Sequence, residues 1–288
     1  MSSLLSPGCL EKPGDAYERL KALIRRIGGA VVAFSGGVDS SLLLAAAHDA
    51  LGPRVLGVTA RSPAYPPHEL EQAVAVARWI GVRHQLVDSC EMDDANYRAN
   101  PPDRCYYCKR ELFRVLQAIA AREGLAAVLD GNHHDDRHDV RPGRKAAREL
   151  GVRSPLAELG FGKELIRRMA RDRGLPNWDR AASACLASRI PYGQPITADR
   201  LRRVDAAEQG LRELGYRVVR VRDHGDLARI ELAADDLDRA TRSENRRRLV
   251  EICRQQGYVF VCLDLEGYRT GSMNETLGRN ARADGVAT

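Results

Sequence analysis

The feature that most constrains this fold is an apolar run that leads through a glycine loop into a helical segment. Residues 30–34 read "AVVAF", the loop "SGGVDSS" occupies residues 35–41, and residues 40–52 have helical character. A short apolar, β-branched run predicts a buried strand. Two adjacent glycines allow a tight turn and a close approach of a ligand to the backbone. We therefore expect the chain to build its core around a unit of strand, loop and helix.

The same alternation continues over the first half of the chain. Further strands are predicted at residues 54–60, 83–89 and 125–131, and helices at residues 15–29, 67–81 and 108–124. Asp15 and Glu18 have the spacing of a capping box at the start of the first helix. Strands that alternate with helices predict an α/β fold, a mainly parallel sheet with helices on both faces. Ligands of such sheets bind at the carboxyl ends of the strands.

The pattern changes after about residue 180. A helix is predicted at residues 197–216, paired strands at 217–225 and 227–233, a long charged helix at 235–257 and a final strand at 258–268. This order is typical of a smaller α+β unit. We therefore expect an N-terminal tail at 1–16, a nucleotide-binding α/β domain at 17–180, and a C-terminal domain at 181–288 for substrate binding and oligomerisation.

The glycine loop has the setting of a phosphate site. A helix that starts directly after the loop directs its unpaired N–H groups and positive dipole end at an anion. A Walker loop is excluded because its Lys-Ser/Thr pair is absent. The alternative is a plain strand-to-helix turn that Asp39 or Ser40 caps. We favour phosphate binding because two serines flank the Gly-Gly-Val-Asp sequence.

This loop resembles the PP-loop of ATP pyrophosphatases, which cleave ATP between the α and β phosphates and adenylate an acyl or carbonyl oxygen. The resemblance implies that the β and γ phosphates are held, together with magnesium, by Ser35, Gly36, Gly37, Asp39 and Ser40. Thr59, after the second strand, would lie near the adenine or ribose. Asp130 ends the fourth strand, where the mouth of the site is expected.

The chain has seven cysteines, and two of them form a CxxC pair, Cys105 and Cys108, in "RCYYCK" before a helix. This is metal-ligand spacing, and Cys185 could supply a third thiolate. Three thiolates suit an iron–sulfur cluster with one open iron. Zinc held with a histidine of "GNHHDD" at 131–136, and a bare redox pair, are the alternatives. The other cysteines are expected in the core or on the tail: Cys9, Cys90, Cys253 and Cys262.

Charge and hydropathy limit the class of protein. The net charge of +6 suits nucleic acid and small phosphorylated ligands equally well. No long apolar run predicts a membrane span, and the N-terminus lacks the pattern of a secretory signal, so we expect a cytoplasmic protein. Aromatic residues make up only 5% of the chain and no dense basic arm interleaves with them, which disfavours a nucleic-acid partner.

Six stretches together resemble the LarE family of ATP-dependent sulfur transferases, over residues 17 to 276. They are "AFSGGVDSSLL", "PPDRCYYCKRELF", "RPGRKAARELGVRSPL", "ACLASRIPYGQPIT", "HGDLARIEL" and "LDLEGYRTGSMNE". The resemblance implies a PP-loop domain, a smaller C-terminal domain and a homohexamer. The substrate would be a pyridinium mononucleotide whose two carboxylates are adenylated and become thiocarboxylates. The product would serve the nickel-pincer nucleotide cofactor of lactate racemase, and other proteins of that biosynthesis would be partners.

Cys185 aligns with a cysteine that in some members of this family gives up its own sulfur and becomes dehydroalanine. Those members lack the CxxC pair, whereas this chain has it. It matches the subgroup in which three cysteines ligate a [4Fe-4S] cluster that carries the transferred sulfur. We therefore expect Cys105, Cys108 and Cys185 to be cluster ligands, with sacrifice of Cys185 as the alternative.

Polar residues near Cys185 complete the expected site. Ser188 and Arg189 follow the cysteine closely, and Arg220 and Arg222 alternate onto one face of a predicted strand. Arginine suits bidentate contacts with phosphate, so we expect these four residues at the substrate phosphate. Three rival functions remain at this point: a PP-loop enzyme that thiolates tRNA, a synthetase that uses ammonia, and a cluster protein without enzymatic activity.

Overall fold

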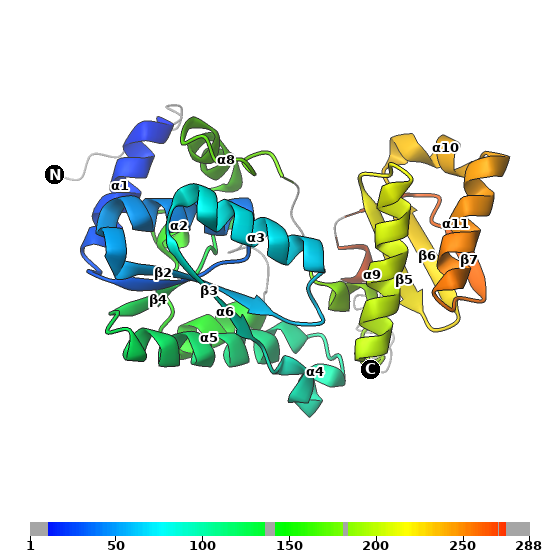
Figure 1. Ribbon diagram of the computed structural model, residues 1–288, viewed down its shortest axis with the longest axis horizontal. Coiled ribbons are helices and arrows are strands. Elements are labelled where there is room, and N and C mark those ends of the chain that lie inside the picture. The colour runs from blue at the N-terminus through cyan, green and yellow to red at the C-terminus, as the bar shows by residue number, and fades with distance from the viewer. Residues whose placement is uncertain (1–10, 136–141, 181–183, 270, 275–288) are drawn as a thin grey trace, which may run out of the picture. The chain divides into compact units, whose positions relative to one another are not determined.

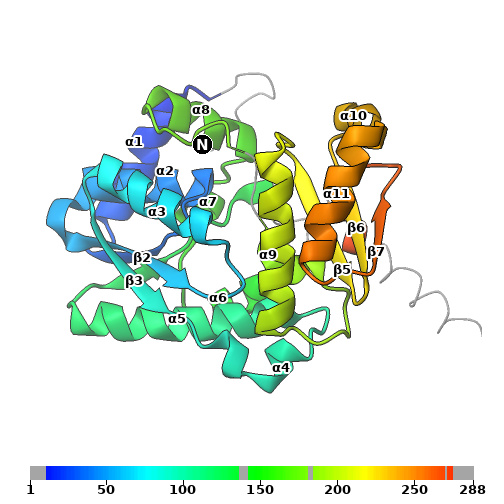
Figure 2. The same cartoon turned by 45° about the vertical axis from the view of Figure 1, so that its right-hand side comes forward.

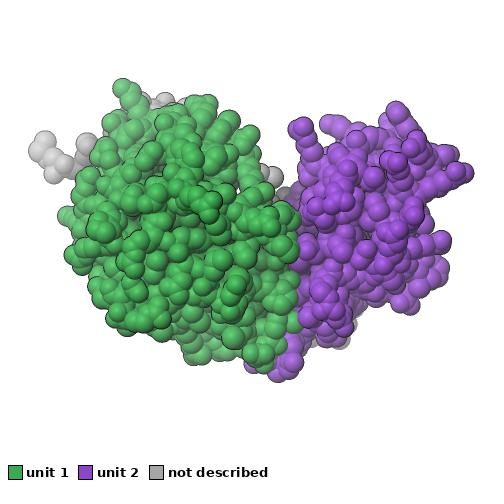
Figure 3. Space-filling view, viewed as in Figure 1, with its two compact units in different colours: residues 1–94, 103–183 green, residues 95–102, 184–288 purple. Residues whose placement is uncertain are grey.

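The structure is a computed structural model that describes residues 11–135, 142–180, 184–269 and 271–274. By its contacts the chain divides into two compact units, which Figure 3 draws in green and purple. Unit 1 comprises residues 1–94 and 103–183, and unit 2 comprises residues 95–102 and 184–288. Unit 2 is thus assembled from two separate stretches of the chain. The domain segments expected from the sequence stay a prediction.

A four-stranded parallel sheet forms the centre of unit 1. Its order is β3 (Arg83–Asp88), β2 (Val55–Arg61), β1 (Ala30–Ala33) and β4 (Ala127–Leu129). β1 pairs with β2 on one side and with β4 on the other, in parallel register from Ala30 onward. The carboxyl ends of all four strands therefore lie at one edge of the sheet. The predicted α/β fold with a parallel sheet is confirmed.

Helices cover both faces of this sheet, as Figures 1 and 2 show from two sides. One face carries α1 (Pro13–Arg25), α2 (Val38–Leu51), α3 (Pro67–Ile80), α7 (Pro155–Glu158) and α8 (Lys163–Asp172). The other face carries α5 (Arg104–Arg122) and α6 (Pro142–Glu149). The described chain also contains short 3₁₀ turns, among them η1 (Gly52–Arg54), η2 (Glu91–Asp93), η4 (Leu186–Arg189), η5 (Ala234–Asp236) and η6 (Ser272–Asn274). None of the helices in the described ranges has the length and apolar character needed to cross a membrane.

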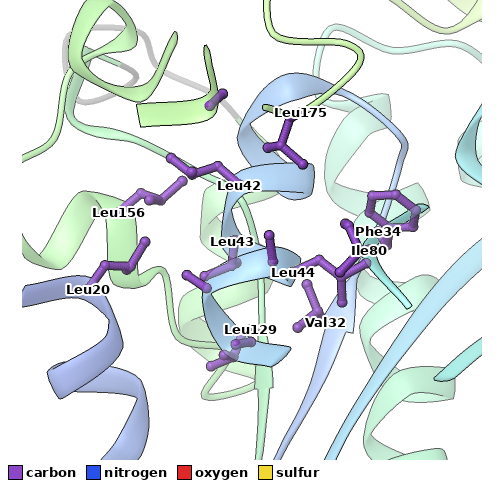
Figure 4. Packing of buried hydrophobic residues seen from close by; sticks show 14 of the residues in the cluster. Leu20, Val32, Phe34, Leu42, Leu43, Leu44, Ile80, Leu129, Leu156 and Leu175 are labelled. Carbon is purple, nitrogen blue, oxygen red and sulfur yellow. The ribbon is translucent and has the colours of Figure 1, made fainter. Parts of the chain in front are cut away.

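The main core of unit 1 surrounds α2. Its residues Leu42, Leu43 and Leu44 are all fully buried, because the helix packs against the sheet, α1 and α8 at once. Figure 4 shows them among Leu20 and Leu156 of the neighbouring helices and other apolar side chains. A helix that is apolar all round is a buried one. This packing fixes the helix that begins directly after the glycine loop.

Unit 2 is built on a three-stranded sheet in the order β5 (Val219–His224), β6 (Leu227–Leu232) and β7 (Phe260–Leu263). β5 and β6 pair with each other, as predicted, in antiparallel orientation, and β7 pairs with β6 in parallel. Residues of α9 (Ala198–Glu213), α10 (Leu237–Thr241) and α11 (Ser243–Gln255) pack onto it and close a second core. The long helix predicted at 235–257 is wrong in one respect, because Arg242 has an extended backbone and divides it into α10 and α11.

The early stretch of unit 2 contains α4 (Ala95–Arg98) and Asn100. The Asn100 side chain is fully buried and its amide donates to the carbonyls of Pro191 at 2.8 Å and Gln194 at 3.0 Å. The N–H of Gly193 donates back to the Asn100 carbonyl at 2.9 Å. Asn100 has a φ of +56°, which asparagine tolerates better than most residues. One amide thus holds the loop that follows Cys185.

Several element boundaries differ from the expected ones. α1 begins at Pro13, with Lys12 as N-cap and no side-chain cap, so the capping box of Asp15 and Glu18 is wrong. α5 begins at Arg104, so the CxxC pair lies inside the first two turns of that helix and not before it. Proline at the first helical position explains the earlier start of α1, because its fixed φ suits a helix.

Leu43→Ala should lower the free energy of unfolding by about 2–5 kcal/mol, because it leaves a cavity where the surrounding helices cannot collapse. Helix propensity will not account for the loss, since alanine is the better helix former. Urea unfolding followed by circular dichroism measures the change. Leu265 is 83% exposed, so Leu265→Ala should stay within about 0.5 kcal/mol of the parent protein. Equal losses in both variants would contradict this account of the core.

Candidate active site

The glycine loop lies between β1 and α2 at the carboxyl edge of the sheet. Gly36 has a φ of +73°, and a Cβ there would lie 3.0 Å from the backbone of Ala73 in α3, so only glycine fits. Ser40 holds the loop from within: its hydroxyl donates to the Gly37 carbonyl at 3.0 Å and accepts from the Ser35 N–H at 3.3 Å. Gly37 is the N-cap of α2, whose dipole favours an anion at this end. The geometry is that of a phosphate site.

Asp39, in the first turn of α2, is paired with a residue that the sequence reasoning missed. The Lys163 ammonium donates to the two carboxylate oxygens of Asp39 at 2.7 and 2.6 Å. Lys163 begins α8, and its backbone N–H donates to the Asp135 carboxylate at 2.7 Å, which caps that helix. Both charged groups remain partly exposed. A lysine and a carboxylate beside a phosphate loop can contact phosphate oxygens and Mg²⁺, respectively.

A pocket opens beside the loop within unit 1. Its lining residues are Ala33, Phe34, Ser35, Val58, Thr59, Ala60, Tyr65, Glu69, Leu70, Lys109 and Leu112. The walls are mostly apolar, with a few polar groups, as is usual for a site that takes a small molecule. The pocket shares Ser35 with the phosphate loop, so one nucleotide could occupy both.

Thr59 lines this pocket but its hydroxyl is already engaged. It donates to the Phe34 carbonyl at 2.7 Å, so the contact with His84 Nε2 at 2.8 Å must be donated by the imidazole. Burial lowers the pKa of His84, which favours the neutral ring. The His84 ring also packs edge-on against Phe34, with centroids 5.6 Å apart. Thr59 therefore shapes the wall of the pocket.

Lys109 is a second residue that the sequence reasoning missed. It directly follows Cys108 on α5 and contributes to the pocket wall. Its ammonium lies 5.7 Å from the centre of the Phe113 ring, and no carboxylate in the described ranges forms an ion pair with it. The sequence could have indicated Lys109, because a residue that directly follows the candidate ligand Cys108 lies at the same end of the helix.

Asp130 is buried at the end of β4, and its carboxylate organises the following turn. It accepts from the Ser154 hydroxyl at 2.6 Å and from the Asn132 side chain at 2.5 Å. The next residue, Gly131, packs so closely on the phosphate loop that a Cβ there would lie 3.0 Å from the Ser40 nitrogen. These contacts give Asp130 a supporting position behind the loop.

The Cys185 segment lies in unit 2 and is organised by a buried ion pair. Arg189 is 2% exposed, and its Nε lies 2.7 Å from Glu208 Oε1. Another guanidinium nitrogen donates to the carbonyls of Ala184 at 2.9 Å and Cys185 at 3.1 Å. We expected Arg189 to contact substrate phosphate. Its contacts instead favour a structural role, which holds Cys185 in place.

Glu208 is the counter-ion on which this arrangement depends. It also accepts from Arg212 at 2.7 Å and from the Val221 N–H at 3.1 Å. Burial alone would raise the pKa of Glu208, but the charges of Arg189, Arg220 and Arg212 outweigh it and hold that pKa below its usual range. The carboxylate is therefore ionised at neutral pH.

The two arginines of β5 differ in what they contact. Arg222 is buried and donates to Glu231 at 2.6 Å and to the Ser188 carbonyl at 3.1 Å, so it too is largely engaged. Arg220 is half-buried and lies 5.1 Å from the Tyr268 ring, and the described residues offer it no carboxylate in an ion pair. Burial and the nearby Arg189 lower the pKa of Arg220. Glu208 acts in the opposite direction and raises that pKa. Arg220 thus stays a predicted phosphate ligand.

The cysteines divide between the units. Cys105 is exposed and Cys108 half-buried in the first two turns of α5 in unit 1, whereas Cys185 is half-buried directly before η4 in unit 2. Within the part of the chain that the structure describes, no three His, Cys, Asp or Glu side chains gather closely enough to bind a metal. Cys253 is in the core as expected, but Cys90 is exposed and Cys262 half-exposed. Cys9 lies outside the described residues.

The sequence of this chain is similar to those of known proteins. The asparagine synthase family matches residues 29–132, which span the glycine loop and the pocket. A protein of Synechocystis without an assigned function is 46% identical, over 90% of this chain and 97% of its own length. The pyridinium-3,5-bisthiocarboxylic acid mononucleotide synthase of Lactiplantibacillus plantarum is 41% identical, over 90% of this chain and 93% of its own length. This chain belongs to the LarE family.

The family resemblance inferred from the sequence is thereby confirmed. A more distant relative matches a smaller share of the chain. The GMP synthase of Aeropyrum pernix is 28% identical over 70% of this chain, which covers 43% of that synthase.

Glu208→Ala should destabilise the protein by about 3–5 kcal/mol, because it leaves the Arg189 guanidinium buried without its counter-ion. Glu213→Ala is the control on the same helix, since Glu213 is exposed, and should change stability by less than about 0.5 kcal/mol. Because the folded pKa of Glu208 is depressed, its contribution is present above the unfolded value of about 4.3 and is lost as the pH falls through the folded pKa. Urea unfolding at pH 7 and pH 3 checks this. A gap between parent and variant that grows toward pH 3 would contradict it.

Proposed function

We propose that this protein is an ATP-dependent sulfur transferase that converts the carboxylates of a pyridinium-3,5-biscarboxylic acid mononucleotide into thiocarboxylates for the nickel-pincer nucleotide cofactor. The proposal rests on a glycine loop that the Ser40 hydroxyl closes by its bond to the Gly37 carbonyl. In the same chain, the buried Arg189 guanidinium donates to the Cys185 carbonyl. Identity of 41% with the Lactiplantibacillus synthase, over nearly the whole of both chains, supports the same substrate class. Action in the cytoplasm, homo-oligomerisation and partner proteins of this biosynthesis stay predictions.

The first half of the reaction is adenylation. A substrate carboxylate oxygen attacks the α phosphorus of ATP, the bond between the α phosphorus and the bridging oxygen breaks, and pyrophosphate leaves. Backbone N–H groups at the start of α2 would hold the β and γ phosphates, with Ser35 and Ser40 supporting the loop. Asp39 would bind the Mg²⁺ that accompanies ATP, and Lys163 would contact the phosphates. The resulting acyl adenylate has a good leaving group.

The second half replaces AMP by sulfur. A sulfur nucleophile attacks the acyl carbon and the bond to the AMP oxygen breaks, which releases AMP. Arg220 would bind the substrate phosphate beside Cys185, while Arg189 and Arg222 hold the surrounding backbone. The Ser188 hydroxyl already donates to the Cys185 carbonyl at 2.7 Å and accepts from Arg189 at 2.8 Å, so it supports the same segment. Arg220 has the half-buried guanidinium that such a contact needs.

The cysteines fit a thiolate-ligated [4Fe-4S] cluster in their chemistry. Cys105 and Cys108 are one turn apart at the start of α5, where helix N–H groups favour negative charge. Cys185 lies beside the positive charge of Arg189. Cys105, Cys108 and Cys185 would hold the cluster, and a bound cluster would supply the sulfur while the cysteines keep theirs.

A second candidate for the sulfur source is Cys185 itself. Donation by Cys185 requires neither a second cysteine nor a cluster. In this case the thiolate attacks the acyl adenylate. Loss of the Cα proton then breaks the bond between Cβ and sulfur, which leaves dehydroalanine in the chain and a thiocarboxylate on the product.

Asp39→Asn should lower the rate of ATP turnover by about 100-fold or more, because it removes the carboxylate proposed to bind Mg²⁺. Ser40→Ala should raise the KM for ATP about tenfold, because the loop loses its internal hydrogen bonds. Asp172→Asn, on the exposed surface of α8, is the matched control and should keep full turnover. Chromatography of the nucleotide products must show AMP and pyrophosphate. Formation of ADP and phosphate would refute adenylation.

The fate of Cys185 separates the two sulfur sources. If three cysteines hold a cluster, the polypeptide keeps its mass after anaerobic turnover, and alanine at position 105, 108 or 185 abolishes both iron binding and product formation. If Cys185 is the donor, each chain reacts once and loses the mass of hydrogen sulfide, and Cys105→Ala remains active. Intact-protein mass spectrometry before and after turnover, with iron and sulfide assays, measures this. Dehydroalanine at position 185 in an active Cys105→Ala variant would overturn the cluster.

A further inference from the structure

In the phosphate loop, the sequence least restricts the orientation of the peptide plane between Gly36 and Gly37. Glycine adopts positive and negative φ almost equally, so a peptide between two glycines can rotate between opposite orientations at little cost. Gly36 has a φ of +73° and Gly37 a φ of −75°. The two orientations differ in which group, the N–H or the carbonyl, faces the ligand. Only the N–H attracts phosphate.

Asn177 fixes this orientation from behind. Its amide nitrogen lies 2.8 Å from the Gly36 carbonyl oxygen and 2.9 Å from the Ser41 hydroxyl. A carbonyl oxygen only accepts, so the amide must present its NH₂ group here. In a planar trans peptide the C=O and the next N–H point in opposite directions. A bond that draws the Gly36 carbonyl toward the interior therefore turns the Gly37 N–H outward, where it donates to the hydroxyl of the exposed Ser35 at 3.4 Å.

The segment that carries Asn177 is itself held firmly. Leu175 is fully buried in the main core of unit 1, and Asn177 is 8% exposed. The Arg180 N–H donates to the Asn177 carbonyl at 3.2 Å, which closes a turn. The Arg167 guanidinium donates to the carbonyls of Asp179 at 3.2 Å and Arg180 at 2.9 Å. The amide is therefore presented to the loop by a rigid turn.

We infer that Asn177 is a positioning residue for the triphosphate, because it locks the Gly36–Gly37 peptide with its N–H directed at the β and γ phosphates. This inference rests on the proposed use of the loop for ATP. Asn177 touches neither the substrate nor the reacting atoms, and it acts through the backbone of the loop. The second bond, to Ser41, orients the amide and contributes less.

The test measures binding of inorganic pyrophosphate and of AMP to the full chain by isothermal titration calorimetry. Asn177→Ala should weaken pyrophosphate binding about tenfold, since one hydrogen bond and a fixed peptide plane are lost, and leave AMP binding within about twofold. Asn177→Asp has the same shape but cannot donate, so it should lose at least as much. Ser41→Ala retains the bond to Gly36 and should stay within about twofold for pyrophosphate.

Asn100→Ala in unit 2 is the matched control, because it also removes a buried amide that donates to backbone carbonyls. It should lower thermal stability and leave pyrophosphate affinity unchanged. If the Asn177→Asp variant binds pyrophosphate with wild-type affinity, the inference that Asn177 fixes the Gly36–Gly37 peptide is wrong, whereas the proposed function stands. Equal losses of pyrophosphate and AMP binding would also overturn this inference, as would a loss in Ser41→Ala equal to that in Asn177→Ala. Failure of the parent protein to bind pyrophosphate would overturn both the inference and the proposed function.

Discussion

Hydrogen bonding along both edges of β1 is the interaction on which the nucleotide site depends. β1 pairs in parallel with β2 and with β4 over the same few residues. The loop that follows β1, Thr59 in β2 and Asp130 after β4 therefore lie together at one edge of the sheet, although they are far apart in the sequence. Bonds across this edge then fix the details, such as the contact of the Thr59 hydroxyl with the Phe34 carbonyl. The core around α2 secures the whole arrangement from one face.

Much of unit 1 could be predicted because its information is local. Each buried strand is a short apolar run, each covering helix has its own periodicity, and the glycine loop lies where one changes into the other. The parallel sheet follows from the alternation alone. Errors occur where local signals compete. In the first helix, proline at position 13 starts the helix before Asp15, and in unit 2 the run at 235–257 looks continuous although Arg242 has an extended backbone.

The candidate site could be predicted only in part, because its polar contacts are not local. Lys163 binds Asp39 across 124 residues, and nothing near either residue in the sequence indicates the partner. The arginines show a second reason. Arg189, Arg220 and Arg222 look alike in the sequence, but Arg189 and Arg222 each form a buried ion pair, whereas no ion pair in the described residues includes Arg220. Burial and pairing, which decide this difference, are properties of the tertiary structure.

The division of unit 2 into two stretches has a consequence for the order in which the protein can fold during translation. Residues 95–102 leave the ribosome long before residues 184–288, which complete the unit. Until the later stretch emerges, the Asn100 amide has none of the carbonyls of residues 190, 191 and 194 that it binds in the finished protein. Unit 1 can form its sheet earlier, while residues 95–102 are still exposed to solvent. The last third of the chain must then return to a segment made some 90 residues before, so unit 2 closes only near the end of synthesis.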